Sequence, residues 1–125
     1  MASSDQENCA QNAAPNVAST KLPISQLNDK LRRDWVGGRV AWTAGVEQLG
    51  IDTLLAIFEA VNEFAAFTPD NDPYGEHDFG AVQIAGQRVY WKIDYYDTAL
   101  EYGSPDPSDP AVTTRVLTVM LASEY

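Results

Sequence analysis

The sequence predicts an α+β fold in which a small antiparallel sheet, one strand plus a β-hairpin, packs against two or three helices in the order α-β-α-β-β-α. Three observations support this prediction. Apolar side chains recur at helical spacing between residues 52 and 67, and two strand-like runs flank Ala85-Gly86. Of the 125 residues, 45% are hydrophobic and 21% are charged, which is typical of a folded domain. We therefore place a single domain at residues 22–125.

Residues 1–21 are expected to form a flexible tail. They are rich in Ser, Ala, Asn and Gln and poor in large apolar side chains. They therefore bury too little surface to offset the entropy that the segment would lose on ordering. The segment has neither a cationic start nor an apolar stretch, which argues against a secretory signal. Cys9 has no partner for a disulfide bond. We expect a cytoplasmic protein.

The folded part begins with a predicted helix over residues 26–35. Ser25 can cap this helix, and Gly37-Gly38 ends it. Its apolar stripe consists of Leu27, Leu31 and Trp35.

A predicted strand over residues 39–43 follows, because the run RVAWT is rich in β-formers. The next helix is predicted over residues 52–67, with Asp52 as its cap. Its apolar positions are Leu54, Leu55, Ile57, Phe58, Val61, Phe64 and Phe67.

Residues 68–78 are predicted to be a loop, and a hairpin with strands at 79–84 and 88–96 follows. Turning at Ala85-Gly86 pairs Gly80 with Trp91, and Gly80 leaves room for the indole. The predicted core face of the hairpin consists of Val82, Ile84, Val89, Trp91 and Ile93.

The C-terminal segment is open to two interpretations. Asp109-Pro110 is a good cap and first helical residue, and apolar side chains recur four residues apart up to about Ser123, which favours a helix. The β-branched residues of the same segment leave a strand as the alternative.

The charge distribution is strongly asymmetric. The chain has a formal net charge of −10, which argues against direct binding to nucleic acid or to anionic lipid. The 48 residues between Arg39 and Arg88 contain no Lys or Arg. They form either a solvated acidic face or a surface that binds a basic protein partner. The candidate partner-binding residues are Glu59, Glu63, Asp70, Asp72, Glu76 and Asp78.

An enzyme is the alternative class. Extending the hairpin register places His77 opposite Asp94, with Lys92 on the diagonal, and a His beside an oriented carboxylate is half of many catalytic dyads. No nucleophile accompanies it in a recognisable motif.

A metal site is a second alternative in this region. Residues 70–75 imitate the start of a calcium loop but lack its ligands at the fifth and twelfth positions. We expect no cofactor, and one His without a usable Cys makes zinc a poor fit. The acidic and imidazole groups that can gather around a divalent ion are Asp72, Glu76, His77, Asp78 and Asp94.

Four long motifs carry a resemblance: E-H-D-F-G, W-K-I-D-Y-Y-D, G-S-P-D-P and R-V-L-T-V-M-L-A. Over residues 39–125 the chain resembles a bacterial family known as domain of unknown function 3768. The family resemblance implies a short acidic protein of plasmids and other mobile elements, and it brings no activity, cofactor or site residue.

The leading expectation is therefore a small non-enzymatic interaction protein that binds a basic protein. The mobile-element setting implied by the resemblance suggests a counter-defence inhibitor, of anti-CRISPR or anti-restriction type, that occupies the groove of a nucleic-acid-handling effector. Association of this kind is steered by charge and weakens as salt screens it.

Overall fold

The computed structural model describes residues 21–125, so the predicted tail lies almost wholly outside the described residues. The three α-helices of the described part are α1 (Ile24–Asp34), α2 (Ala44–Glu47) and α3 (Ile51–Glu63). Its four strands are β1 (Arg39–Trp42), β2 (Phe79–Ile84), β3 (Gln87–Tyr96) and β4 (Thr114–Leu121). Two short 3₁₀ turns, η3 (Pro110–Val112) and η4 (Ala122–Glu124), flank β4.

The four strands form one mixed sheet in the order β1-β4-β3-β2, with β1 parallel to β4 and the other pairs antiparallel. The α+β class is confirmed, but the three-stranded antiparallel sheet is wrong. The difference arises at the C-terminus, where the favoured helix is instead strand β4, between β1 and β3. Burial along β4 alternates, so that Arg115, Leu117 and Val119 all face the helices.

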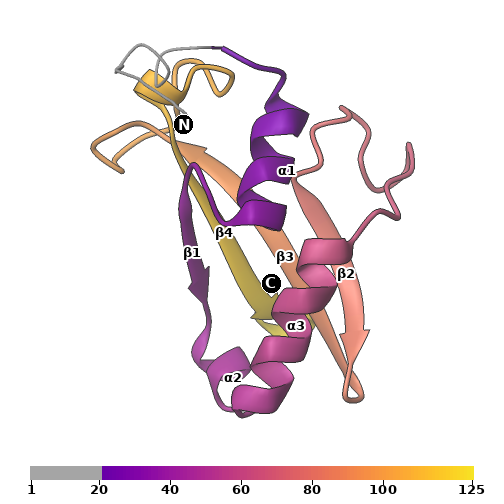
Figure 1. The fold of residues 1–125 in the computed structure, drawn as a ribbon. Helices are drawn as coiled ribbons and strands as arrows, with labels where there is room; N and C mark the ends of the chain where they lie inside the picture. The colour runs from indigo at the N-terminus through magenta and orange to yellow at the C-terminus, as the bar shows by residue number, and fades with distance from the viewer. Residues whose placement is uncertain (1–20) are drawn as a thin grey trace, which may run out of the picture.

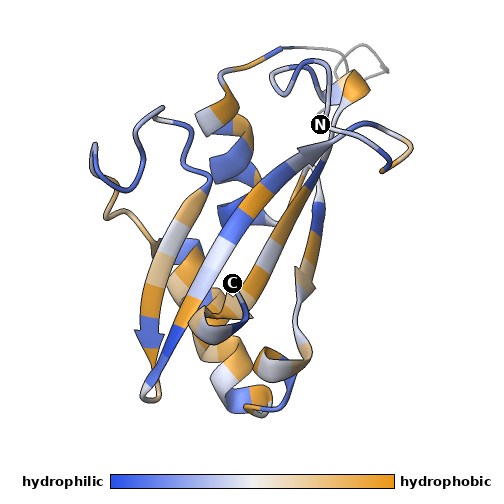
Figure 2. Cartoon of the chain, turned by 180° about the vertical axis from the view of Figure 1, so that it is seen from behind, coloured by the Kyte–Doolittle hydropathy of each residue, from blue (hydrophilic) through white to orange (hydrophobic). Residues whose placement is uncertain are grey.

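The helices cover one face of the sheet, and α1 and α3 lie across it in Figure 1. Figure 2 shows the opposite face from behind; within residues 21–125 no α-helix lies over it, and Tyr125 packs on it against Phe79 and Tyr90. The core between the layers contains Leu31, Val46, Leu54, Ile57, Val61, Val89, Trp91, Ile93, Leu117 and Val119. None of the helices in residues 21–125 is both long and apolar enough to span a membrane.

The hairpin is confirmed in its turn and its register. Gly80 pairs with Trp91, and the turn residues Ala85 and Gly86 have φ values of 52° and 79°. Two positive φ values are the requirement of the tight turns that join twisted strands. A Cβ at Gly80 would lie 2.6 Å from Cε2 of Trp91, so the absent side chain does leave room for the indole.

The helix over residues 52–67 is shorter than predicted. Helix α3 ends at Glu63, because Phe64 adopts φ −58° and ψ 132°. Phe64 and Phe67 still reach the core, where each ring packs edge-on against Trp91. Their apolar spacing therefore reflects core packing beyond the end of the helix.

The C-terminal turn fixes the corner between β1 and α2. The Glu124 carboxylate accepts hydrogen bonds from the Thr43 hydroxyl at 2.6 Å and from the Gly45 N–H at 3.3 Å. The hydrogen bond from Thr43 and one from the Leu121 N–H lower the pKa of Glu124. The turn thereby positions the end of β1, whose last residue is Trp42.

Candidate interaction site

The acidic residues assigned to partner binding separate into two groups. Glu59 and Glu63 on α3, together with Asp70 in the loop that follows, are exposed. None of these three forms an ion pair within residues 21–125. They remain available to a partner.

The other three acids have contacts inside the protein. The buried Asp72 carboxylate accepts hydrogen bonds from the N–H groups of Glu76 at 3.0 Å and His77 at 3.2 Å. The Glu76 carboxylate accepts a hydrogen bond from the Tyr95 hydroxyl at 2.9 Å. Burial, followed by the charge of Glu76, raises the pKa of Asp78. These groups shape the loop over residues 72–78.

The predicted pairing of His77 with Asp94 is wrong. The ladder between β2 and β3 ends at Phe79, and His77 has a left-handed backbone with φ 57°. Its Nδ1 lies 3.0 Å from the Asp29 carboxylate, on the helix side of the sheet. Asp94 lies on the opposite face, where its carboxylate is 2.9 Å from Nζ of Lys92.

The alternative metal site is also not formed. Because Asp94 lies on the far face, the five candidate ligands do not converge. No group of three or more His, Cys, Asp or Glu side chains suited to a metal occurs in residues 21–125. The calcium-like segment is instead a turn, closed by a hydrogen bond of 2.8 Å from the Asp72 N–H to the Thr68 carbonyl.

Arg32, on α1, is wholly buried, although it is a charged residue. Its guanidinium donates to the carbonyls of Val61 at 3.0 Å and Phe64 at 2.7 Å, which lie at the C-terminal end of α3. A cation at this end of a helix is favoured by the helix dipole. The rings of Phe67 and Trp91 lie 5.3 and 5.4 Å from the guanidinium carbon.

Asp29 joins Arg32 to His77. Its carboxylate accepts a hydrogen bond of 2.6 Å from Arg32, and the His77 ring stacks on Phe67 at 4.0 Å. Burial raises the pKa of Asp29, but hydrogen bonds from Arg32 and His77, with their charges, outweigh it and hold the pKa below its usual range. The cluster fastens α1 to α3 and to the loop before β2, which is a structural role.

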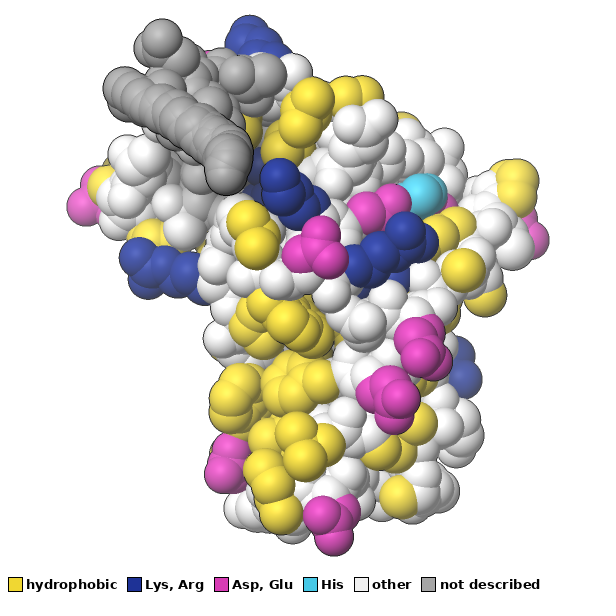
Figure 3. All heavy atoms as spheres, in the orientation of Figure 1, with side chains coloured by type: hydrophobic (Ala, Val, Ile, Leu, Met, Phe, Trp, Pro, Cys, Tyr) yellow, Lys and Arg dark blue, Asp and Glu magenta, His cyan; other side chains and the backbone are white. Residues whose placement is uncertain are grey.

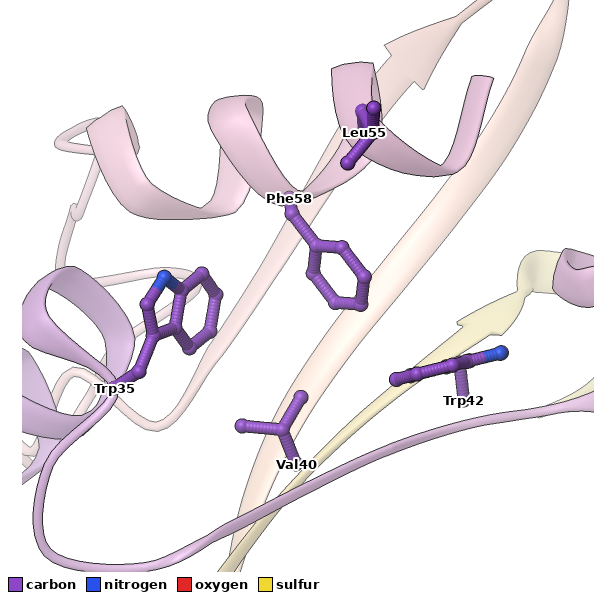
Figure 4. Close-up of a pocket in the computed structure, with 5 residues that line it drawn as sticks. All are labelled: Trp35, Val40, Trp42, Leu55 and Phe58. Carbon is purple, nitrogen blue, oxygen red and sulfur yellow. The ribbon is translucent and has the colours of Figure 1, made fainter. Parts of the chain in front are cut away.

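A pocket of about 390 Å³ opens beside β1 (Figure 4). The ring of Phe58 lies between two indoles, edge-on to Trp35 at 5.6 Å and to Trp42 at 5.4 Å. Val40 and Leu55 complete the lining. All five side chains are apolar or aromatic, so the pocket favours an apolar occupant.

Three elements contribute to the pocket. Trp35 directly follows α1 with a left-handed backbone at φ 58°, rather than lying on the helical stripe predicted for it. Val40 and Trp42 occupy alternate positions of β1, and Leu55 and Phe58 are three residues apart on α3.

The pocket lining is unusually accessible for such large side chains. Trp35 and Trp42 are each 41% exposed, and Leu55 is 59% exposed. In Figure 3 hydrophobic side chains gather on the lower half of this side of the molecule, with acidic side chains around them. Exposed apolar surface with a polar rim is typical of an interaction site.

Sequence reasoning missed this pocket, although α3 carries a signal for it. One helix face buries Leu54, Ile57 and Val61, and this face accounts for its contact with the sheet. Leu55 and Phe58 lie beside that face, widen the apolar surface of α3 and line the pocket. Apolar side chains on a surface helix beyond those that pack on the sheet indicate that the helix has a second contact surface.

Residues 42–124 match the family described as Protein of unknown function (DUF3768). The chain belongs to this family. No curated protein and no solved structure matches the chain significantly. Within this DUF3768 protein, the matched residues include Trp42, Leu55 and Phe58 of the pocket, whereas Trp35 and Val40 precede them.

Proposed function

We propose that this DUF3768 protein is a small acidic interaction protein, without enzymatic activity, that binds a basic protein in the cytoplasm. One observation carries the proposal: a 48-residue span without Lys or Arg, in which Glu59 and Glu63 stand exposed and free of ion pairs within residues 21–125.

The energetics of α3 favour this interpretation over a merely solvated face. Glu59 and Glu63 lie four residues apart on one helix, where like charges destabilise by roughly 0.2–0.5 kcal/mol. No cation on α3 offsets this repulsion. A basic partner would relieve it, and the long-range field of a chain with net charge −10 would speed the encounter.

The most specific form of the proposal is a counter-defence inhibitor of anti-CRISPR or anti-restriction type. Such a protein occupies the groove in which a nucleic-acid-handling effector binds phosphates, and carboxylates take the place of the phosphates. The acidic span and the mobile-element setting implied by the family resemblance support this form. Direct binding to nucleic acid is not part of it, because the net charge is negative.

The test is recovery of partners from bacterial lysate on the immobilised protein at low salt, with identification by mass spectrometry. The expected result is a basic nucleic-acid-handling protein that elutes as the salt concentration rises. The double variant Glu59→Lys/Glu63→Lys should recover much less of this protein than wild type does. Glu101→Lys is the control, because Glu101 is exposed outside the acidic span. Recovery of no basic protein, or equal recovery by the charge-reversed variant, would refute the proposal.

A further inference from the structure

We infer that the pocket and the open edge of β1 together form a docking site for an extended segment of a basic protein, with a large apolar side chain in the pocket and Lys or Arg beside it. The inference rests on the proposed function for the charge of the partner. It adds the place of binding and the chemistry of the bound segment.

The first step concerns the backbone of β1, which is an edge strand. The Thr43 N–H donates to the Val119 carbonyl at 3.1 Å, so Thr43 and, by alternation, Ala41 direct their backbone groups toward β4. In a parallel pair the intervening residues direct theirs away, so Val40 and Trp42 present N–H and C=O groups at the open edge. No hydrogen bond within residues 21–125 uses these groups. Unpaired edge groups are a template for an added strand.

The second step is that the same two residues line the pocket. The side chains of Val40 and Trp42 face the helices, beside Phe58 and Leu55 (Figure 4). A segment paired with β1 directs every second side chain to this face of the sheet. One of these side chains would lie over the pocket, whose volume of about 390 Å³ suits a large apolar group.

The third step is the charge at the rim. The Nε1–H of Trp42 donates to the exposed Glu47 carboxylate, which places this carboxylate beside the pocket. Glu59 follows Leu55 by one helical turn and is also exposed. Both carboxylates favour Lys or Arg in the bound segment, on either side of the apolar side chain that enters the pocket. The accessible indoles of Trp35 and Trp42 can stack with such cations. The one cation of β1, the exposed Arg39, lies at the start of the strand, at the opposite end from Trp42.

Two other occupants fit these features less well. Residues 1–20 of the chain contain no Lys, Arg or aromatic residue, so they supply neither the cation nor a large ring. A second copy would bring two molecules of net charge −10 together. A basic segment of another protein meets both the apolar and the acidic parts of the site.

The experiment selects binders from a displayed library of random heptapeptides at low salt, with the whole folded chain as bait. We expect a consensus with one large apolar residue flanked by Lys or Arg. A synthetic consensus peptide, titrated into ¹⁵N-labelled protein, should shift the amide resonances of Val40 and Trp42 more than those of β2, the opposite edge. Leu55→Glu should weaken binding at least tenfold. Ile51→Glu, the same change at an exposed position outside the pocket lining, should alter it less than twofold.

Several outcomes would overturn the inference: no selected consensus, an acidic consensus, shifts confined to β2, or equal binding by Leu55→Glu in a form with an unchanged thermal melt. Shifts at Val40 and Trp42 that follow protein concentration without peptide would show that a second copy is the occupant. A basic partner bound equally by Leu55→Glu and wild type would refute the docking site alone. Recovery of no basic partner, with neutral apolar peptides still selected at the pocket, would refute the proposed function.

Discussion

At the residue scale, Trp91 and Gly80 are matched across the hairpin. Trp91 is fully buried against Phe64 and Phe67. Trp91→Ala should lower the free energy of unfolding by about 3–5 kcal/mol, because it removes the largest buried side chain and leaves a cavity. Gly80→Ala should also destabilise, since its methyl group would overlap the indole. Urea melts measure both effects.

Tyr96→Phe is the control for these two variants. Tyr96 lies on the opposite face of the same strand, and its hydroxyl makes no hydrogen bond within residues 21–125. The change should alter the free energy of unfolding by no more than about 0.5 kcal/mol. Small and equal shifts for Trp91→Ala and Tyr96→Phe would contradict the assignment of the two faces.

Asp29 provides a pH prediction. Its pKa in the folded state lies below its usual value, so its ionised form contributes stability above the unfolded pKa of roughly 3.9, and that stability is lost as pH falls through the folded pKa. Asp29→Asn should therefore be less stable at pH 7, and its stability should depend less on pH below about 5. Denaturant melts between pH 2 and 7 provide the comparison. An unchanged slope would show that the Asp29 carboxylate does not support Arg32.

The pKa shift of Asp78 is opposite in direction to that of Asp29, so its effect on stability is also opposite. Burial raises its pKa in the folded state, so its ionisation lowers stability as pH rises through the unfolded and then the folded pKa. Asp78→Asn should therefore raise the free energy of unfolding at pH 7 relative to wild type. The same series of melts tests it, and a loss of stability at pH 7 would contradict the direction of the shift.

At the element scale, the central position of β4 predicts its dynamics. Among residues 21–125, β4 is paired on both sides, whereas β1 and β2 each have one unpaired edge. Native-state hydrogen exchange should therefore show the slowest amides in β4 and β3, and faster exchange at Val40 and Trp42. Fast exchange throughout residues 114–121 would contradict a central strand.

The elements differ in how far the sequence predicts them. The hairpin follows from local information, because Ala85-Gly86 and the alternation on either side specify both turn and register. In β4, Leu117 and Leu121 satisfy a helical spacing as well as an alternating one. Pairing with β1 and β3 decides in favour of the strand, and this pairing joins segments far apart in the chain.

The same contrast applies to the candidate site. The exposure of Glu59 and Glu63 follows from their place on α3. The contact between His77 and Asp29 could not be predicted in this way, because Asp29 is 48 residues away in the chain. The left-handed backbone of His77 also takes its side chain out of the hairpin register. The pocket joins residues after α1, in β1 and on α3, which no local pattern connects.

At the scale of the whole molecule, charge and apolar surface meet on one side. The helix layer carries the acids of α3, and the pocket opens between this helix and β1 (Figure 3). Charge governs the rate of encounter over a screening length of roughly 8–10 Å at ordinary salt concentrations, whereas the buried apolar contact governs how long the complex lasts. Substitutions of the acids on α3 are therefore expected to change mainly the association rate, and substitutions in the pocket mainly the dissociation rate.

The most direct test of the interaction proposal is the dissociation constant of the basic partner recovered from lysate, measured at several salt concentrations for wild type, Glu59→Lys and Glu101→Lys. The two variants carry the same change in net charge and differ only in its place. The proposal predicts that affinity falls as salt rises, and that Glu59→Lys weakens low-salt binding at least severalfold more than Glu101→Lys. Equal affinities for the two variants, or a dissociation constant independent of salt, would contradict it.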